Sequence, residues 1–141
     1  MHRPTERFVM LSSVELYCID PEIVFKFWRF ARPFIFAASA RTGLTDPEET
    51  EYGVLVGDHL LWIVWDGEIK AAATTHLSDN VCTFTACGGK DMSQWIRFFP
   101  RFEKYASDEG CVLRIAGRKG WQRALRRAGF SAETTIFERP V

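Results

Sequence analysis

The chain has 141 residues and a mass of 16.2 kDa, a length typical of one compact domain, so we expect a single domain over residues 1–141. Hydrophobic residues make up 47% and charged residues 26%, which supplies enough apolar surface to offset chain entropy and excludes a disordered chain. Lysine plus arginine and aspartate plus glutamate both number 18, so the net charge is zero. A neutral chain has no overall attraction to nucleic acid or to an anionic membrane.

The longest apolar runs cover only residues 60–65 and 34–38, too short for a membrane span or a signal peptide. The four cysteines, Cys18, Cys82, Cys87 and Cys111, show neither a C-x-x-C pair nor the framework of a secreted protein. We therefore expect buried structural thiols, no bound metal and a cytoplasmic location. Because Cys82 and Cys87 lie an odd number of residues apart in one expected strand, they should face opposite sides of a sheet.

The first third of the chain predicts a strand followed by two helices. Residues 14–19 have the composition of a short strand, and Asp20-Pro21-Glu22 then supplies the N-cap, proline and acid of a helix start. Pro33 predicts that this helix kinks or ends close by. Thr45-Asp46-Pro47-Glu48 has the spacing of a capping box and predicts a second, short helix.

The middle of the chain predicts a three-stranded antiparallel meander. Residues 59–66 form a nearly unbroken apolar run that ends in the hairpin signal Asp66-Gly67. Residues 69–76 predict the returning strand and residues 81–87 the third strand. The first of the three should be covered on both faces.

The last third changes to a helical period. Aromatic residues from Ser93 onward recur on one helix face, and Pro100 predicts a kink or an early break in this helix. Residues 111–116 predict a buried strand that runs parallel to the last strand of the meander, because a helix joins the two. A final helix over residues 121–128 and a final strand over residues 131–138 complete the chain.

This order of elements resembles that of the GNAT-type N-acetyltransferases over nearly the whole chain. The most specific piece is the stretch from Gly117-Arg118-Lys119-Gly120-Trp121 to Gly129-Phe130, because that family usually ends its last helix in Gly-Phe before a last strand. The resemblance implies an α+β fold: one GNAT-like domain whose central mixed, mostly antiparallel sheet is flanked by about four helices. The Gly-Arg-Lys-Gly-Trp opening and Cys87-Gly88-Gly89 more narrowly resemble small GNAT-like proteins of short-tailed bacteriophages and prophages.

The resemblance also implies where acetyl-CoA would bind. In that family it lies where the last meander strand splays from the next parallel strand, with its pyrophosphate on backbone N–H groups at the start of the long helix. The corresponding loop, residues 86–94, has two glycines and a lysine but lacks the family's spacing of Gln or Arg, two residues, Gly, one residue, and Gly or Ala. The residues that could contact the cofactor are Cys87, Gly88, Gly89, Lys90 and Ser93. A plain turn is the alternative.

The resemblance further implies a general acid, commonly a tyrosine five residues before the phenylalanine of Gly-Phe. That position is Leu125, which cannot transfer a proton. An active enzyme would need other groups, and the candidates are Glu68 and His76 as the general base and Tyr105 or Cys111 as the acid. The alternatives are a hydrogen-bonded or solvent-facing His76 and a Tyr105 that packs in the core.

Five positive charges lie within ten residues near the C-terminus: Arg118, Lys119, Arg123, Arg126 and Arg127. They could meet phosphate or an acidic partner surface, and the alternative is a solvated outer helix face. Since the net charge is zero, acids elsewhere balance them, with Asp46, Glu48, Glu49 and Glu51 as the expected counterpart. Such a dipolar surface suits self-association or docking to a neighbour.

Two functions follow as hypotheses. The first is a non-catalytic, phage-type GNAT-fold protein without a cofactor that binds phage structural proteins or itself in virion structure or morphogenesis, in the host cytoplasm or in the virion. The second is an acetyl-CoA-dependent N-acetyltransferase with an atypical pyrophosphate loop, which needs a cleft between the strands near Cys87 and Cys111. A nucleic-acid adaptor that uses the basic patch is a third alternative, and we expect no membrane partner.

Overall fold

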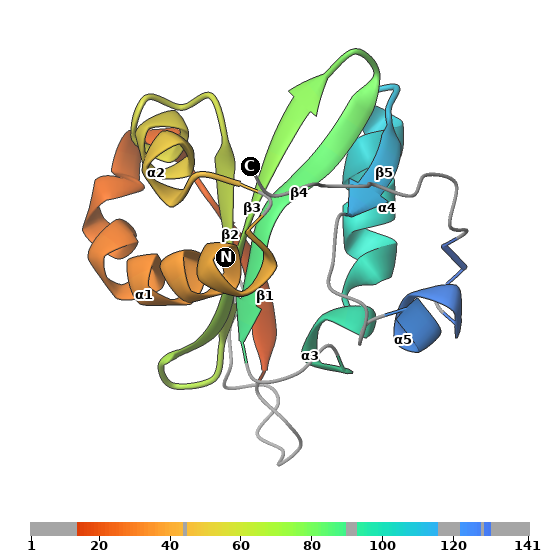
Figure 1. Cartoon of the computed structure of the whole chain (residues 1–141), viewed down its shortest axis with the longest axis horizontal. Coiled ribbons are helices and arrows are strands. Elements are labelled where there is room, and N and C mark those ends of the chain that lie inside the picture. The colour runs from red at the N-terminus through yellow and green to blue at the C-terminus, as the bar shows by residue number, and fades with distance from the viewer. Residues whose placement is uncertain (1–13, 44, 90–92, 116–121, 128, 131–141) are drawn as a thin grey trace, which may run out of the picture.

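The computed structural model describes residues 14–43, 45–89, 93–115, 122–127, 129 and 130. Its centre is a five-stranded sheet in the order β1-β2-β3-β4-β5 (Figure 1). The strands are β1 Glu15–Ile19, β2 Leu60–Trp65, β3 Ile69–Ser78, β4 Val81–Gly89 and β5 Val112–Ile115. The first four pair antiparallel and β5 pairs parallel with β4, so the predicted α+β fold with a mixed, mostly antiparallel sheet is confirmed.

One face of the sheet is covered by two helices, α1 Phe25–Thr42 and α2 Pro47–Leu55 (Figure 1). A short 3-10 helix, Pro21–Ile23, precedes α1, and the side chain of Asp20 caps it by accepting the backbone N–H of Glu22 at 2.9 Å. The second helix begins where the capping pattern predicts. Its N-cap is Asp46, which accepts the N–H of Glu48 at 3.0 Å.

The expectation that the first helix kinks or ends near Pro33 needs correction, because α1 runs through Pro33 to Thr42. Pro33 itself is exposed. The buried side chains of α1 continue at helical spacing on both sides of it: Trp28, Ala31, Ile35, Ala38 and Ser39. Burial of this stripe against the sheet outweighs the one backbone hydrogen bond that a proline removes.

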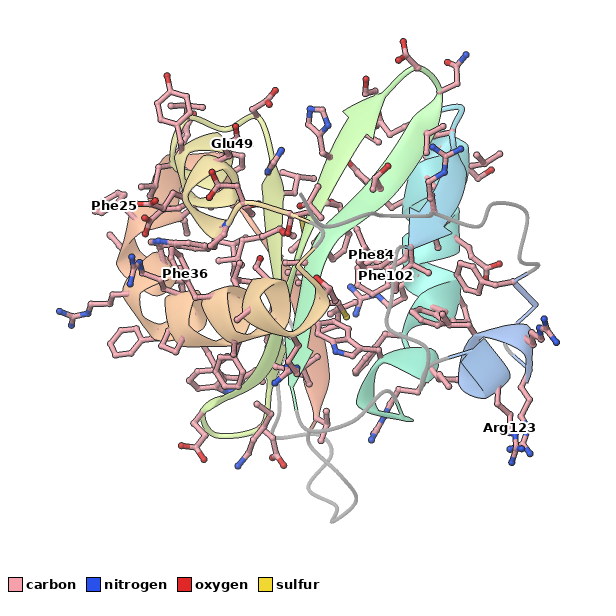
Figure 2. The ribbon with its side chains drawn as sticks, viewed as in Figure 1. Phe25, Phe36, Glu49, Phe84, Phe102 and Arg123 are labelled. Atoms are coloured by element: carbon pink, nitrogen blue, oxygen red, sulfur yellow. The ribbon has the colours of Figure 1, made fainter. Side chains whose placement is uncertain are left out.

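The opposite face is covered by α3 Ser93–Ile96, α4 Phe99–Asp108 and α5 Gln122–Arg127 (Figure 1). The predicted helix from Ser93 is divided in two, with Pro100 in the first turn of α4, which confirms the expected break. An aromatic cluster joins these helices to the sheet and consists of Trp62, Phe84, Trp95, Phe98, Phe99 and Phe102. Figure 2 shows Phe84 of β4 beside Phe102 of α4, whose ring centroids lie 4.9 Å apart.

A β-bulge lies in the middle of β4. Thr74 of β3 pairs with Ala86 and Thr75 pairs with Phe84, so Thr85 is an extra residue without a partner in the register. Its hydroxyl lies 2.7 Å from that of Thr74. The bulge reverses the alternation of side chains, and Cys87 joins the same cluster as Phe84.

Two further expectations change with this geometry. Cys82 lies two residues before Phe84 and therefore shares its face, so the prediction that Cys82 and Cys87 face opposite sides is wrong. β5 is not buried, because Val112 is 63% exposed and its residues alternate between exposed and half-buried. It is the last strand of the described sheet, and α4 covers one face of it.

Among the described residues, no helix combines the length and the apolar composition that crossing a membrane requires.

Candidate functional site

β4 continues past its described pairing with β5, and we call this stretch of β4, residues 85–89, the fork. β4 pairs with β5 over residues 81–84 and then continues from 85 to Gly89, five residues that have no β5 partner among the described residues. The backbone N–H and C=O groups along this edge of β4 can pair with an amide-containing ligand. This fork is the place where the resemblance puts the pantetheine arm of acetyl-CoA, which carries two amide groups. Lys90, together with residues 91 and 92, lies outside the described residues.

The buried side chains of residues 85–89 pack in the apolar core. Cys87 is buried in the cluster that holds Trp95, which is 1% exposed and lies 6.1 Å from Phe102 by ring centroids. Burial raises the pKa of the Cys87 thiol, so this side chain stays neutral. A neutral thiol neither attracts nor repels a phosphate through its charge. Trp121 lies outside the described residues.

The two glycines of the fork have packing reasons of their own. A side chain on Gly88 would project into the backbone carbonyl of Phe34 in α1. A Cβ on Gly89, whose φ is +154°, would lie 2.7 Å from the Cβ of Ala71 in β3. Glycine at both positions therefore follows from the close approach of α1 and β3, without a bound phosphate. Ser93 begins α3, which is only four residues long.

The structure separates three of the four candidate catalytic residues, Glu68, Tyr105 and His76. Glu68 lies in the β2–β3 turn, where the Lys70 Nζ donates to it at 2.8 Å and thereby lowers the pKa of Glu68. Tyr105 packs edge-on against Trp62 with centroids 5.3 Å apart, and burial raises its pKa to about 12. His76 is opposite Thr83, which lies in the part of β4 that pairs with β5. His76 is therefore level with the paired part of β4 and not with residues 85–89.

His76 instead belongs to a cluster with Asp58 and His59, which we call the histidine cluster. The Asp58 Oδ2 lies 3.3 Å from the His76 Nε2, and the two imidazole rings meet edge-on with centroids 4.6 Å apart. Burial, followed by the nearby His76, lowers the pKa of His59. One possible ligand atom from each of the three residues lies within 4.8 Å of the other two.

Sequence reasoning missed this cluster, although its signal was present. The predicted hairpin pairs Leu60 with Thr75, and the same register places His59 next to His76. An open pocket of about 620 Å³ adjoins the cluster, between the end of α2 and the loop before β2. Its walls are Glu49, Tyr52, Gly53, Val56, Gly57, Asp58 and His59.

The structure describes three of the five basic residues near the C-terminus. Arg123, Arg126 and Arg127 are exposed on α5, and Figure 2 shows Arg123 pointing away from the body of the molecule. Arg118 and Lys119 lie outside the described residues. On the inner side of the same helix, Leu125 packs against the aromatic cluster.

Comparison with known proteins gives the fold. No family model matches the chain, and no curated protein matches it. The chain is similar to an aminoglycoside acetyltransferase from an uncultured soil metagenomic sample, solved with sisomicin, at a TM-score of 0.63 and 11% identity over 91% of this chain and 95% of that one.

Two further solved structures agree. A predicted acetyltransferase from Clostridium acetobutylicum, solved with acetyl-CoA, has a TM-score of 0.63 at 11% identity, covering 90% of this chain and 96% of that one. A GCN5-related N-acetyltransferase from Ralstonia eutropha has a TM-score of 0.62 at 13% identity, covering 92% of this chain and 99% of that one. At these identities the likeness concerns the fold and does not bear on the phage resemblance. The chain has the fold of the GNAT-type N-acetyltransferases.

Proposed function

We propose that the chain is an acyl-CoA-dependent N-acyltransferase. The observation that carries the proposal is the fork, in which β4 continues for five residues past its pairing with β5 and has no partner on that edge among the described residues. An extended arm with amide groups can add to such an edge as a further strand would. Because fold alone does not establish an activity, the proposal depends on this edge.

The described residues fit one part of the cofactor. The edge of β4, whose Cys87 packs with Trp95 in the apolar core, suits an arm that alternates amide and methylene groups. Gly88 and Gly89 are explained by packing, so we assign the phosphates to neither of them. When bound, acyl-CoA supplies an acyl group activated as a thioester.

The residues of the chain orient this arm and exclude water from one side of it. Leu125 cannot donate a proton, and acid catalysis is typically worth about a hundredfold to ten-thousandfold in rate. We therefore expect slow acyl transfer to an amine. Tyr105 does not replace the missing acid, because it packs against Trp62 and lies near Cys82, in the part of β4 that pairs with β5.

The test combines calorimetry with hydrogen exchange. Acetyl-CoA is titrated into the full chain, and amide exchange is then compared with and without the ligand. We expect a micromolar dissociation constant and slower exchange in peptides that cover residues 85–89, with no change over residues 60–65 as the internal control. No heat up to about 1 mM, or binding that leaves residues 85–89 unprotected, would overturn the proposal.

A second candidate function is the non-catalytic one, in which the chain binds phage structural proteins or a further copy of itself. The observation that favours it is on α1, where Phe25 and Phe30 are 64% and 54% exposed. Large exposed apolar side chains are common where proteins dock.

The test of this second function is the protein content of purified particles of a phage whose genome encodes the chain. A fixed copy number that falls in a Phe25→Ser, Phe30→Ser variant, and not in an Arg41→Ser control at the other end of the same helix, would support it. Absence of the chain from such particles would contradict it.

A further inference from the structure

The histidine cluster combines three side chains that proteins use as metal ligands. Two imidazoles and one carboxylate form a donor set that suits zinc and its neighbours in the transition series. Candidate ligand atoms of Asp58, His59 and His76 lie within 4.8 Å of one another. We propose that these three residues bind a divalent transition metal of the zinc type, independently of acyl transfer.

The distances are close to those that a metal would require. Tetrahedral zinc with bonds of about 2.0–2.1 Å holds its ligand atoms about 3.3 Å apart. The Asp58 Oδ2 and the His76 Nε2 already lie 3.3 Å apart. His59 reaches its place by a small side-chain movement, since its ligand atom lies within 4.8 Å of the other two.

The backbone holds two of the ligands in place before any metal binds. The N–H groups of Asp58 and His59 both donate to the carbonyl of Gly53, at 2.8 and 3.0 Å. These bonds fix the loop between α2 and β2 against the last turns of α2. The third ligand, His76, is on β3, whose pairing with β2 places it beside His59. The three residues therefore come from elements that the fold itself brings together, which lowers the entropic cost of forming a site.

The imidazole of His59 has an unusual environment. Its Nδ1 is buried and has no hydrogen-bond partner among the described residues. It faces Gly53, where an added Cβ would lie only 2.8 Å from this nitrogen. Gly53 thus provides the space that the ring occupies. A buried imidazole nitrogen without a hydrogen-bond partner is costly to keep in a protein, and a metal bound to this nitrogen would offset the cost.

The site would remain open to solvent. Three protein ligands leave at least one coordination position for water or a small ligand, and the pocket of about 620 Å³ is lined by Asp58 and His59. A metal can therefore enter from solvent. Zinc is the metal that this combination favours, because it accepts imidazole and carboxylate together and tolerates a coordination number of four.

The first experiment is calorimetric titration of zinc chloride into tag-free protein from which metal has been removed. We expect one zinc per chain with a micromolar or lower dissociation constant. His59→Gln and His76→Gln should each weaken binding by about a hundredfold or more, and Asp58→Asn by about tenfold or more. Asp79→Asn is the control, because it removes an exposed carboxylate from the β3–β4 turn and should leave the affinity unchanged.

A second measurement separates this site from the cysteines. The cobalt(II) form should show the weak visible bands of nitrogen and oxygen ligands, without the intense near-ultraviolet band of a thiolate ligand. If a histidine variant does not fold, Gly53→Ala displaces the His59 ring from outside the cluster and should weaken zinc binding while circular dichroism stays native. No zinc bound up to about 1 mM, unchanged affinity in His76→Gln, or a thiolate band would each overturn the proposal.

Discussion

The backbone carbonyl oxygen of Phe34 in α1 occupies the place into which a side chain on Gly88 of β4 would project. Helix and strand are in direct contact here, and only a residue without a Cβ fits between them. Since backbone atoms form both sides of the contact, neither side can yield by changing a rotamer. We expect Gly88→Ala to lower the free energy of unfolding by about 3 kcal/mol, as overpacking in a rigid site does.

Gly43→Ala is the control for this prediction. Gly43 ends α1 with a φ of +65°, and nothing lies within 4 Å of its added Cβ. Its substitution should cost only the strain of the left-handed conformation, about 1 kcal/mol. Urea denaturation measures both variants. Equal losses at the two glycines would show that α1 does not restrict position 88.

Glu51 joins the two helices on the other side of the sheet from α4. Its Oε2 accepts the indole N–H of Trp28 and the Nε–H of Arg32, each at 2.6 Å. These hydrogen bonds, Trp28 first and then Arg32, hold the pKa of Glu51 below its ordinary value of 4.5. A lowered pKa in the folded state stabilises the fold above pH 4.5, and this stabilisation is lost as the pH falls through the folded-state pKa.

We therefore expect Glu51→Gln to have a lower melting temperature than the parent at neutral pH, by an amount that shrinks as the solution is acidified below pH 4.5. Thermal melts across this range measure the difference. Glu103→Gln, at an exposed position of α4, serves as the control for loss of one negative charge. A difference that stays constant with pH would show that the bonds to Glu51 do not depend on its charge.

The strands and caps of this fold follow from local sequence. Asp20 and Asp46 begin their helices because each side chain caps its own N-terminus, and Asp66-Gly67 forms the β2–β3 turn because a hairpin needs such residues. The course of α1 past Pro33 depends on burial against a sheet that is distant in sequence. The bulge at Thr85 depends likewise on the pairing of β3 with β4, so neither could be predicted locally.

Part of the candidate site can likewise be predicted from local sequence, and part of it cannot. Leu125 is visible in the sequence because it is defined by its distance from Gly129-Phe130. The reason for glycine at 88 comes from Phe34, which is 54 residues earlier in the chain, and no local pattern carries it. The meeting of His59 and His76 could have been predicted from the hairpin register. Asp58 could not, because the bond of its N–H to Gly53 places it.

A buried hydrogen bond crosses the centre of the sheet. The indole Nε1–H of Trp62 donates to the Thr75 Oγ1 at 2.9 Å, and both residues are buried. Thr75→Val keeps the shape of the side chain but leaves the indole N–H without this acceptor. We expect a loss of about 1–3 kcal/mol in the free energy of unfolding. Thr75→Ser keeps the hydroxyl and should cost about 1 kcal/mol, the value of one buried methyl group. A valine variant at least as stable as the parent would contradict the role of this bond.

Leu125 offers a gain-of-function test of the proposed acyl transfer. It packs from α5 against the aromatic cluster beside the fork, at the position where the resemblance places a proton-donating tyrosine. If acyl transfer is limited by the missing acid, Leu125→Tyr should raise kcat by about tenfold or more, within the range of general acid catalysis. The release of free CoA thiol from acetyl-CoA, in the presence of a panel of primary amines, measures the rate.

Leu125→Phe is the matched control, because it adds the same ring without the hydroxyl. A proton donor predicts a higher rate for tyrosine alone, with a pH dependence that the parent lacks, whereas improved packing predicts equal rates for the two aromatic variants. Because Tyr and Phe differ by one oxygen atom, their ratio removes any effect of the variants on stability or on cofactor affinity. Acetyl-CoA bound by both variants with no thiol released by either would exclude catalysis at the fork and favour the binding function.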